Sequence, residues 1–325
     1  MPPPPLVSVV VSTHNRPERL ARLLAALRAQ TIASDRFEVV VVDNGSRPET
    51  ASILDREQAH GGLPLRTLRL QTTAGPAGGR NLGWHQAVAP LVAFTDDDCQ
   101  PSPQWLTAIL AAAAAHPGAV LQGPTRPAPD ELERDGLLSH TVRIEGLGPQ
   151  YETCNIAYPR AVLEALGGFD ERFGRQPSGE DTDLAWRAIA AGRETVFVPA
   201  AVVHHAVEPI GVSGMLRRAA RWSAVVRVFA DHPGTRSMLY RGRFWNVWHY
   251  LLYRSLLALA GPPWLRRLLI TRHLLALRRR ARSSPGARSV RRGAGPAAVF
   301  FLLVHDSVEC WAVARGAIRY RTLVL

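Results

Sequence analysis

Three consecutive aspartates, Asp96, Asp97 and Asp98, are the strongest chemical signal in the sequence. They follow an apolar run at residues 90–95 that predicts a buried strand. Carboxylates this close together raise one another's pKa unless a cation is present. Mg²⁺ or Mn²⁺ resolves that conflict, and typically takes one or two carboxylates together with phosphate oxygens. The triplet therefore indicates a metal site for a nucleotide diphosphate, with a solvated turn that caps a helix as the alternative.

Alternating strand and helix signals surround this triplet. Runs rich in β-branched or apolar residues predict strands at residues 6–12, 37–42 and 90–95, and a further strand is expected at 65–70. Leucines at 20, 23, 24 and 27 repeat with helical spacing, and a glycine-rich turn at 74–79 leads into a short helix. Strands joined by helices favour a mainly parallel α/β sheet, whose ligands bind beyond the carboxyl ends of the strands. Asp43, the glycine-rich turn and the triplet all lie near such ends.

Further helices are expected from Trp105 to about His116, at 160–166 and after residue 179, and a last strand at 194–199. Residues 123–150 are rich in proline, glycine and charge, which predicts a long loop or irregular hairpin. After about residue 210 the sequence becomes a series of arginine-rich helical segments, with a basic linker at 283–298. We therefore expect an α/β domain over 1–210 and a helical extension over 211–325.

The charge supports this division. The 325 residues carry a formal charge of +12, but residues 1–205 have 18 arginines against 23 acids, a balance of −5. Residues 206–325 have 21 arginines against 4 acids, a balance of +17. Three cysteines at no metal-ligand spacing indicate a reducing cytosol. The N-terminus shows no signal peptide, and no apolar run approaches the ~20 residues that span a bilayer, so no transmembrane segment is predicted.

Several motifs in order resemble the family 2 glycosyltransferases of the GT-A fold. They are VSVVVSTHNRPERL at 7–20, VVVVDNGS at 39–46, AGPAGGRNLGW at 74–84, VAFTDDDCQPSPQWL at 92–106, TCNIAYPRAVLEALGGFDERF at 153–173, GEDTDLAWRAIAAG at 179–192 and VPAAVVHH at 198–205. The resemblance covers about two-thirds of the chain. It implies a Rossmann-like, mixed but mainly parallel sheet flanked by helices, and a metal-dependent, inverting sugar transfer.

For the donor, the resemblance implies a nucleotide site made by a common set of polar side chains. Thr13, Asn15 and Glu18 would line its nucleotide end, Asp43 would bind the base or ribose, and Arg80 would approach the base or diphosphate. Asp96 and Asp98 match the two acids of a D-x-D motif, with Asp96 near the ribose and Asp98 on Mn²⁺ or Mg²⁺. Since the middle residue is also acidic, Asp97 could take either duty.

For the chemistry, Asp181 matches the family's general base. An inverting displacement needs a carboxylate opposite the departing nucleotide to take the acceptor's hydroxyl proton. We expect the helix start to keep Asp181 ionised. The same position suits a helix N-cap, so Glu180 or Asp183 could take one of the two roles.

A histidine pair and three acceptor-side positions complete the expected site. Adjacent strand residues point to opposite faces, so only one of His204 and His205 can enter the site, and the alignment favours His205 as a metal or diphosphate ligand. Asn155 and Asp170 are expected to shape the acceptor side with Glu180, although Asp170 could simply cap a turn.

The basic extension predicts peripheral contact with an anionic membrane surface, because its arginines are interleaved with leucine and tryptophan. The alternative is that the arginines only solvate a helical bundle. Nucleic-acid binding is not expected, since no recognition motif is present.

Taken together, the sequence predicts an enzyme that transfers a sugar from a nucleotide-diphosphate sugar to a hydroxyl acceptor, lipid-linked in many relatives. The expected setting is polysaccharide or glycolipid assembly at the cytoplasmic face of the membrane. Two rivals are a sugar-phosphate nucleotidyltransferase, which would want a glycine-rich phosphate loop after the first strand, and a non-catalytic sugar-nucleotide-binding or scaffold protein.

Overall fold

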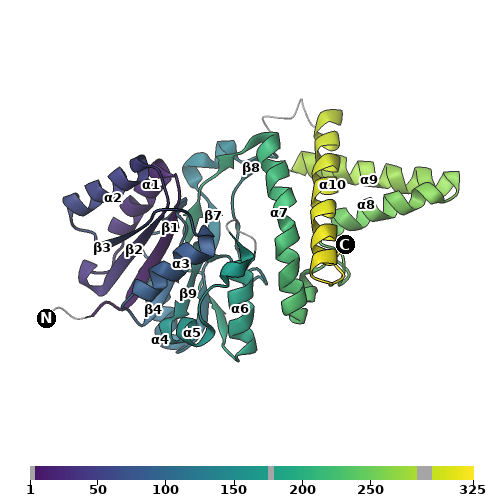
Figure 1. Ribbon diagram of the computed structural model, residues 1–325. Helices are drawn as coiled ribbons and strands as arrows, with labels where there is room; N and C mark the ends of the chain where they lie inside the picture. The colour runs from purple at the N-terminus through teal and green to yellow at the C-terminus, as the bar shows by residue number, and fades with distance from the viewer. Residues whose placement is uncertain (1–3, 175–178, 284–294) are drawn as a thin grey trace. The chain divides into compact units, whose positions relative to one another are not determined.

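The computed structural model describes residues 4–174, 179–283 and 295–325, and forms two compact units (Figure 1). The first unit comprises Met1–Pro129 and Val142–Ala206, and the second comprises Asp130–Thr141 and Val207–Leu325. The sequence places residues 130–141 in the first domain, whereas here they belong to the second unit. They belong there because β8 (Ser139–His140) pairs antiparallel with β12 (Glu208–Pro209).

The first unit is built on a seven-stranded sheet in the order β10-β6-β9-β4-β1-β2-β3. Its neighbouring strands are parallel except around β9, which is antiparallel to β4 and β6. The strands are β1 (Val7–Thr13), β2 (Phe37–Asn44), β3 (Leu65–Leu70), β4 (Leu91–Phe94), β6 (Val120–Gln122), β9 (Ile156–Pro159) and β10 (Thr195–Phe197). The mixed, mainly parallel sheet predicted from the sequence is confirmed.

Helices cover both faces of this sheet, because its central strands are apolar on both sides. Val9 and Val11 of β1 belong to one buried cluster, which includes the leucines of α1, and Val10 belongs to another with α3, α5 and α6. The helices of the unit are α1 (Pro17–Arg28), α2 (Pro48–His60), α3 (Gly75–Gln86), α4 (Trp105–Ala115), α5 (Arg160–Leu166) and α6 (Glu180–Ala190).

Two of these helices differ from the sequence-based expectation. The stretch 74–79, predicted as a glycine-rich turn, lies largely inside α3, which begins at Gly75. Helix α2 was not predicted; it buries only Thr50, Ala51 and Leu54, so it lacks the apolar periodicity that marks α1.

After β4 the chain enters a second, three-stranded sheet, which has the order β5-β11-β7. It consists of β5 (Cys99–Pro101), β7 (Thr125–Pro127) and β11 (Val203–His205). β11 runs antiparallel to β5 and places His205 opposite Cys99. The segment expected to be a loop or irregular hairpin contains β7, a 3-10 helix at Pro129–Arg134, β8, and an isolated bridge between Thr125 and Ile144.

The second unit is helical, as the sequence predicts. It contains α7 (Gly211–Asp231), α8 (Val247–Leu257), α9 (Pro263–Ser283) and α10 (Pro296–Arg319), with 3-10 turns at Pro233–Met238 and Ala258–Ala260. Its buried clusters include Val226, Phe229 and Val313, and separately Leu277 and Leu302. Most of the predicted basic linker, residues 284–294, lies outside the described residues.

Among the described residues, α10 alone is long and apolar enough by length and composition to span a membrane. No such segment is predicted from uninterrupted apolar runs, because Asp306 and Glu309 interrupt the apolar sequence of α10. Two acids interrupt α10, and both are buried within the helical unit: Asp306 accepts hydrogen bonds from Arg280 at 2.9 and 3.1 Å, and Glu309 lies 3.1 Å from His249. One face of α10 is therefore a polar core face of this unit.

Candidate active site

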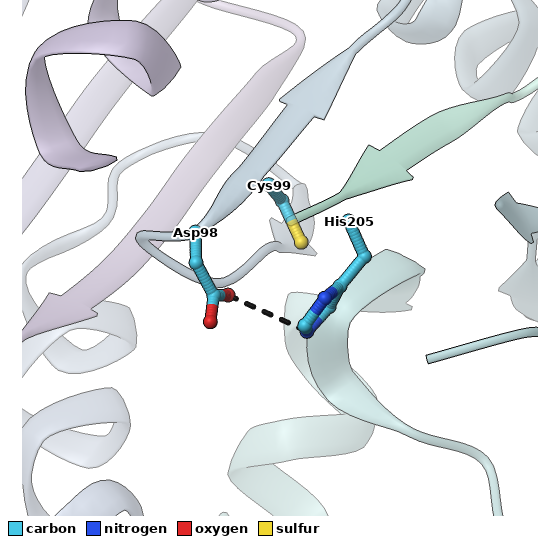
Figure 2. A group of neighbouring side chains, drawn as sticks. All are labelled: Asp98, Cys99 and His205. Atoms are coloured by element: carbon cyan, nitrogen blue, oxygen red, sulfur yellow. Dashed lines mark ion pairs between the residues drawn. The ribbon is translucent and has the colours of Figure 1, made fainter. Parts of the chain in front are cut away.

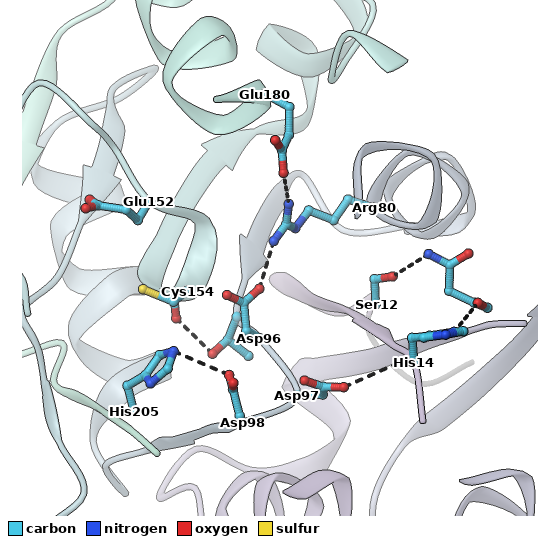
Figure 3. Close-up of polar contacts among 12 residues, drawn as sticks. Ser12, His14, Arg80, Asp96, Asp97, Asp98, Glu152, Cys154, Glu180 and His205 are labelled. Atoms are coloured by element: carbon cyan, nitrogen blue, oxygen red, sulfur yellow. Dashed lines mark hydrogen bonds and ion pairs between the residues drawn. The ribbon is translucent and has the colours of Figure 1, made fainter. Parts of the chain in front are cut away.

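The three aspartates diverge after β4, and each has different partners (Figure 3). Asp96 Oδ1 accepts a hydrogen bond of 2.9 Å from Arg80 Nη2. Asp97 Oδ2 accepts one of 2.7 Å from Thr13 Oγ1. Asp98 Oδ1 lies 3.5 Å from His205 Nε2. The triplet thus joins the end of β1, the middle of α3 and the end of β11, which are far apart in the sequence.

Arg16, which was not predicted as a site residue, neutralises part of this charge. Its Nη1 pairs with Asp97 Oδ1 at 3.2 Å and also with Asp98 Oδ2. Burial and the charge of Asp98 nevertheless raise the pKa of Asp97 to about 7, against the opposing effects of Arg16 and Thr13. A basic residue between strand β1 and helix α1 was the available signal, since the carboxyl ends of β1 and β4 are adjacent in the sheet.

Asp98, Cys99 and His205 form a compact group in which one potential ligand atom of each lies within 4.8 Å of the others (Figure 2). Nδ1 of His205 lies 2.8 Å from the carbonyl oxygen of Ala206, which can only accept a hydrogen bond. Nδ1 therefore donates to this carbonyl, and Nε2 faces Asp98. This arrangement is typical of metal-binding histidines.

The donor set fits a divalent cation that prefers oxygen and imidazole ligands. Burial, followed by the neighbouring Cys154 and then the charges of Asp98 and Asp96, raises the pKa of Cys99 well above its usual value, so Cys99 is a thiol at neutral pH. The remaining carboxylate and imidazole suit Mn²⁺ or Mg²⁺ with phosphate oxygens. A second group, His305, Asp306 and Glu309, has comparable spacing. There, however, Arg280 already neutralises Asp306.

Arg80 connects the aspartate triplet to the GEDTDL segment. In addition to its bond to Asp96, its Nη1 donates to Glu180 Oε1 at 3.0 Å, and its guanidinium carbon lies 5.7 Å from the centre of the Phe169 ring. Burial lowers the pKa of Arg80, but the charges of Asp96 and Glu180 outweigh it and raise that pKa above its ordinary value. Two acidic motifs 84 residues apart therefore bind opposite sides of one permanently charged guanidinium.

The orientation of α3, which carries Arg80, is fixed by the GGFDERF segment. Asn81 Nδ2 donates to the carbonyl of Phe169 and to Glu171 Oε1, both at 2.9 Å. Gly168 has a φ of +68°, and a Cβ there would lie 2.5 Å from Trp84 Nε1. Glycine is required at this position both for its backbone conformation and for the close approach of Trp84.

Asp181 is the second residue of α6, and the helix N-cap is Gly179, so Asp181 does not cap the helix. Its Oδ1 accepts a hydrogen bond of 2.8 Å from the backbone N–H of Thr182. We expected the helix start to keep Asp181 ionised, but burial and the adjacent Glu180 raise its pKa to about 8, despite the opposing charge of Arg80. Asp183 is engaged elsewhere, in a 2.8 Å ion pair with Arg187.

The residues expected at the nucleotide end occupy the ends of β1 and β2. Asn15 has a φ of +56°; its Oδ1 accepts a hydrogen bond of 2.9 Å from Arg47 N, and its own backbone N–H donates to Ser46 Oγ at 3.0 Å. Asp43 is buried and accepts from Ser46 N at 2.9 Å and Arg69 Nε at 3.0 Å. These contacts join the two strand ends. Glu18 instead lies exposed in the first turn of α1.

Two residues expected on the acceptor side have structural contacts. Asn155 is fully buried: its Oδ1 accepts from Trp105 Nε1 at 2.8 Å, and its Nδ2 donates to the carbonyls of Pro124 and Ala201. Its amide therefore ties core segments together and does not face a ligand. Asp170 caps the short 3-10 helix Glu171–Phe173 by accepting from Arg172 N, which matches the turn-capping alternative.

Comparison with solved structures places this architecture in the GT-A fold. The mannosyltransferase PcManGT from Pyrobaculum calidifontis, solved in complex with GDP-Man and Mn²⁺, aligns with a TM-score of 0.62 at 22% identity, covering 98% of this chain and 88% of that one. The family model for glycosyl transferase family 2 matches residues 8–166, and the model for glycosyl transferase family group 2 matches residues 151–306. The chain belongs to glycosyl transferase family 2.

Two curated relatives illustrate the range of the family. Validoxylamine A glucosyltransferase of Streptomyces hygroscopicus subsp. limoneus is 32% identical over 224 residues, which cover 58% of this chain and 49% of the relative. Succinoglycan biosynthesis protein ExoM of Rhizobium meliloti is 30% identical over 210 residues, covering 62% of this chain and 67% of ExoM. The matched region spans only about half the length of the first of these relatives.

Proposed function

We propose that this chain is an inverting glycosyltransferase, which moves a sugar from a nucleotide-diphosphate sugar to an acceptor hydroxyl with the help of Mn²⁺ or Mg²⁺. One observation carries the proposal: Arg80 binds both Asp96 of the triplet and Glu180, the neighbour of Asp181. This bridge brings a cation-binding group and a candidate base to one site, as a displacement at a sugar carbon requires.

In the proposed reaction the acceptor oxygen attacks the anomeric carbon, and the bond from that carbon to the diphosphate oxygen breaks. Asp181, as a carboxylate, takes the proton of the acceptor hydroxyl. Asp98 and His205 would hold the cation, with Asp96 or Asp97 nearby; when bound, it supplies positive charge beside the departing diphosphate. Arg16 and Arg80 contribute fixed positive charge in the same region.

We place the nucleotide at the ends of β1 and β2, near Thr13, Asn15 and Asp43. A relative named for succinoglycan biosynthesis supports a saccharide acceptor, and we propose polysaccharide or glycolipid assembly as the setting. A sugar-phosphate nucleotidyltransferase is less consistent with the segment THNRPERL, which has no glycine after β1.

Release of nucleotide diphosphate from UDP-glucose, UDP-GlcNAc and GDP-mannose, with and without Mn²⁺, tests the function. Asp181→Asn should lower turnover about 10²–10⁴-fold, the usual contribution of a general base, while thermal shift shows that donor binding persists. Asp183→Asn is the matched control from the same helical turn, and should lose stability with its Arg187 ion pair but keep most turnover.

Undiminished turnover by Asp181→Asn would remove the base assignment. A protein that binds a donor but releases no nucleotide with a broad panel of acceptors would instead favour the binding or scaffold alternative.

A further inference from the structure

Exposed apolar side chains are concentrated in the helical unit. Of the 16 large apolar side chains that are exposed among the described residues, only Val88 and Leu147 belong to the first unit. Scattered single examples are normal on a protein surface, whereas a concentration marks a contact surface. The concentration of exposed apolar side chains therefore indicates that the helical unit has a contact surface.

Five of these side chains lie where α8 meets α9, which we call the hairpin tip (residues 256–268). Leu257 is 77% exposed and Trp264 is 67% exposed. Leu256, Leu259 and Leu268 are each about half exposed. α8 and α9 lie side by side, and their joined end projects away from α10 (Figure 1). The tip is thus the projecting, apolar end of a helical pair.

Buried contacts fix the two helices that carry the tip. Ser255 Oγ of α8 and His273 Nδ1 of α9 lie 3.1 Å apart, and both residues are buried. Leu277 of α9 packs with Leu302 of α10 in a buried cluster. The exposed leucines and Trp264 are therefore presented by helices fixed in the unit's core.

The charge around the tip is entirely of one sign. Residues 232–305 contain 14 arginines and no aspartate or glutamate. On α9, Trp264, Leu268 and Leu275 share one exposed face at spacings of four and seven residues, and exposed arginines 278, 279 and 282 follow in the last turns. Basic residues thus border the apolar face along the same helix.

We propose that the hairpin tip inserts into the interface of an anionic lipid bilayer without spanning it. A fluid anionic bilayer matches both features of this projecting end, because its acyl chains accept the apolar side chains and its phosphates pair with the arginines. Leucines would enter the acyl boundary, Trp264 would lie at headgroup level, and Arg266 and Arg267 would contact lipid phosphates. This surface is independent of the catalytic proposal.

Vesicle flotation of the full chain tests the proposal, using phosphatidylcholine alone and phosphatidylcholine mixed with phosphatidylglycerol. The parent should float with the anionic vesicles, and its binding should weaken as the salt concentration rises. Leu257→Glu and Trp264→Glu should each lower the partition coefficient about tenfold. Leu147→Glu is the matched control, because it places the same charge at an exposed leucine of the first unit, and it should float like the parent.

Arg266→Gln and Arg267→Gln should each lower binding to anionic vesicles about fivefold and leave binding to neutral vesicles unchanged. Nucleotide release measured without vesicles should be unaltered in the tip variants, so the two proposals can fail separately. Flotation of Leu257→Glu equal to that of the parent would overturn the insertion proposal and favour α10 as the anchor. A parent that does not float, or that forms dimers which Leu257→Glu dissolves, would overturn it as well.

Discussion

Asp181 is subject to two opposing influences. Its position in the first turn of α6 favours the carboxylate, whereas burial and the charge of Glu180 favour the neutral acid, and the balance raises its pKa to about 8. A base must be ionised to accept a proton, so the ionised fraction falls about tenfold for each pH unit below that value. We expect kcat/KM at saturating Mn²⁺ to rise with pH and level off above about pH 8.

Glu180→Gln provides the control for this pH profile. It removes the neighbouring charge that helps to raise the pKa of Asp181, so the midpoint should move to lower pH. A pH-independent rate between about pH 6 and 9, or an unchanged midpoint in Glu180→Gln, would contradict the assignment of Asp181.

Arg16 gives a second prediction at this scale. Its guanidinium pairs with Asp97 and Asp98, so it repels a cation that approaches the same carboxylates. Arg16→Met should therefore increase the affinity for Mn²⁺ in the absence of nucleotide, by about tenfold, as measured by titration calorimetry. Arg28→Met removes the same charge from an ion pair with Glu57 elsewhere on α1 and should leave the affinity unchanged; equal effects would indicate only a general charge effect.

At the scale of elements, α3 depends on glycines that let it approach the sheet. A Cβ on Gly79 would collide with Ser12 Oγ of β1 and lie 2.8 Å from Asn44 Nδ2 of β2. Gly79→Ala should cost about 2 kcal/mol, which lowers Tm by roughly 4–8 °C, and it should reduce turnover because Arg80 is the next residue. Gly146→Ala is the control, since a Cβ there meets nothing within 4 Å. Equal melting temperatures for the two variants would contradict this packing role.

The glycines also show where sequence-based prediction of the elements succeeds and where it fails. β1 and β2 were predicted because valines buried on both faces form unbroken runs. In α3 the same glycines that usually mark a turn instead serve close helix–sheet contact, which only the fold reveals. For this reason the helix was predicted, but its start was placed after the glycines and not at Gly75.

The site shows a similar division. The triplet and GEDTDL were found because clustered acids stand out locally. Their connection through Arg80, the pairing of Arg16 with Asp97, and the burial of Asn155 depend on contacts between residues distant in sequence. Asn155 in particular cannot be distinguished from a ligand-binding amide until its three partners are known.

At the scale of the whole molecule, the formal charge of +12 divides into an acidic region with the candidate active site and a basic region with the exposed apolar tip. The strongly basic character therefore does not describe the surface at which we propose donor binding. It describes a separate region whose arginines border apolar side chains. The two proposed ligands, an anionic nucleotide and an anionic bilayer, are recognised by different units.

This separation predicts two distinct footprints in hydrogen–deuterium exchange. UDP or GDP with Mn²⁺ should slow exchange several-fold in the loops after β1, β2 and β4 and at the start of α6, because binding stabilises the local native structure. Anionic vesicles should slow exchange at residues 256–268 and along α9. Leu257→Glu should lose the second footprint and keep the first. Protection by the nucleotide confined to the helical unit would contradict the site, since it would place the donor away from Arg80 and the triplet.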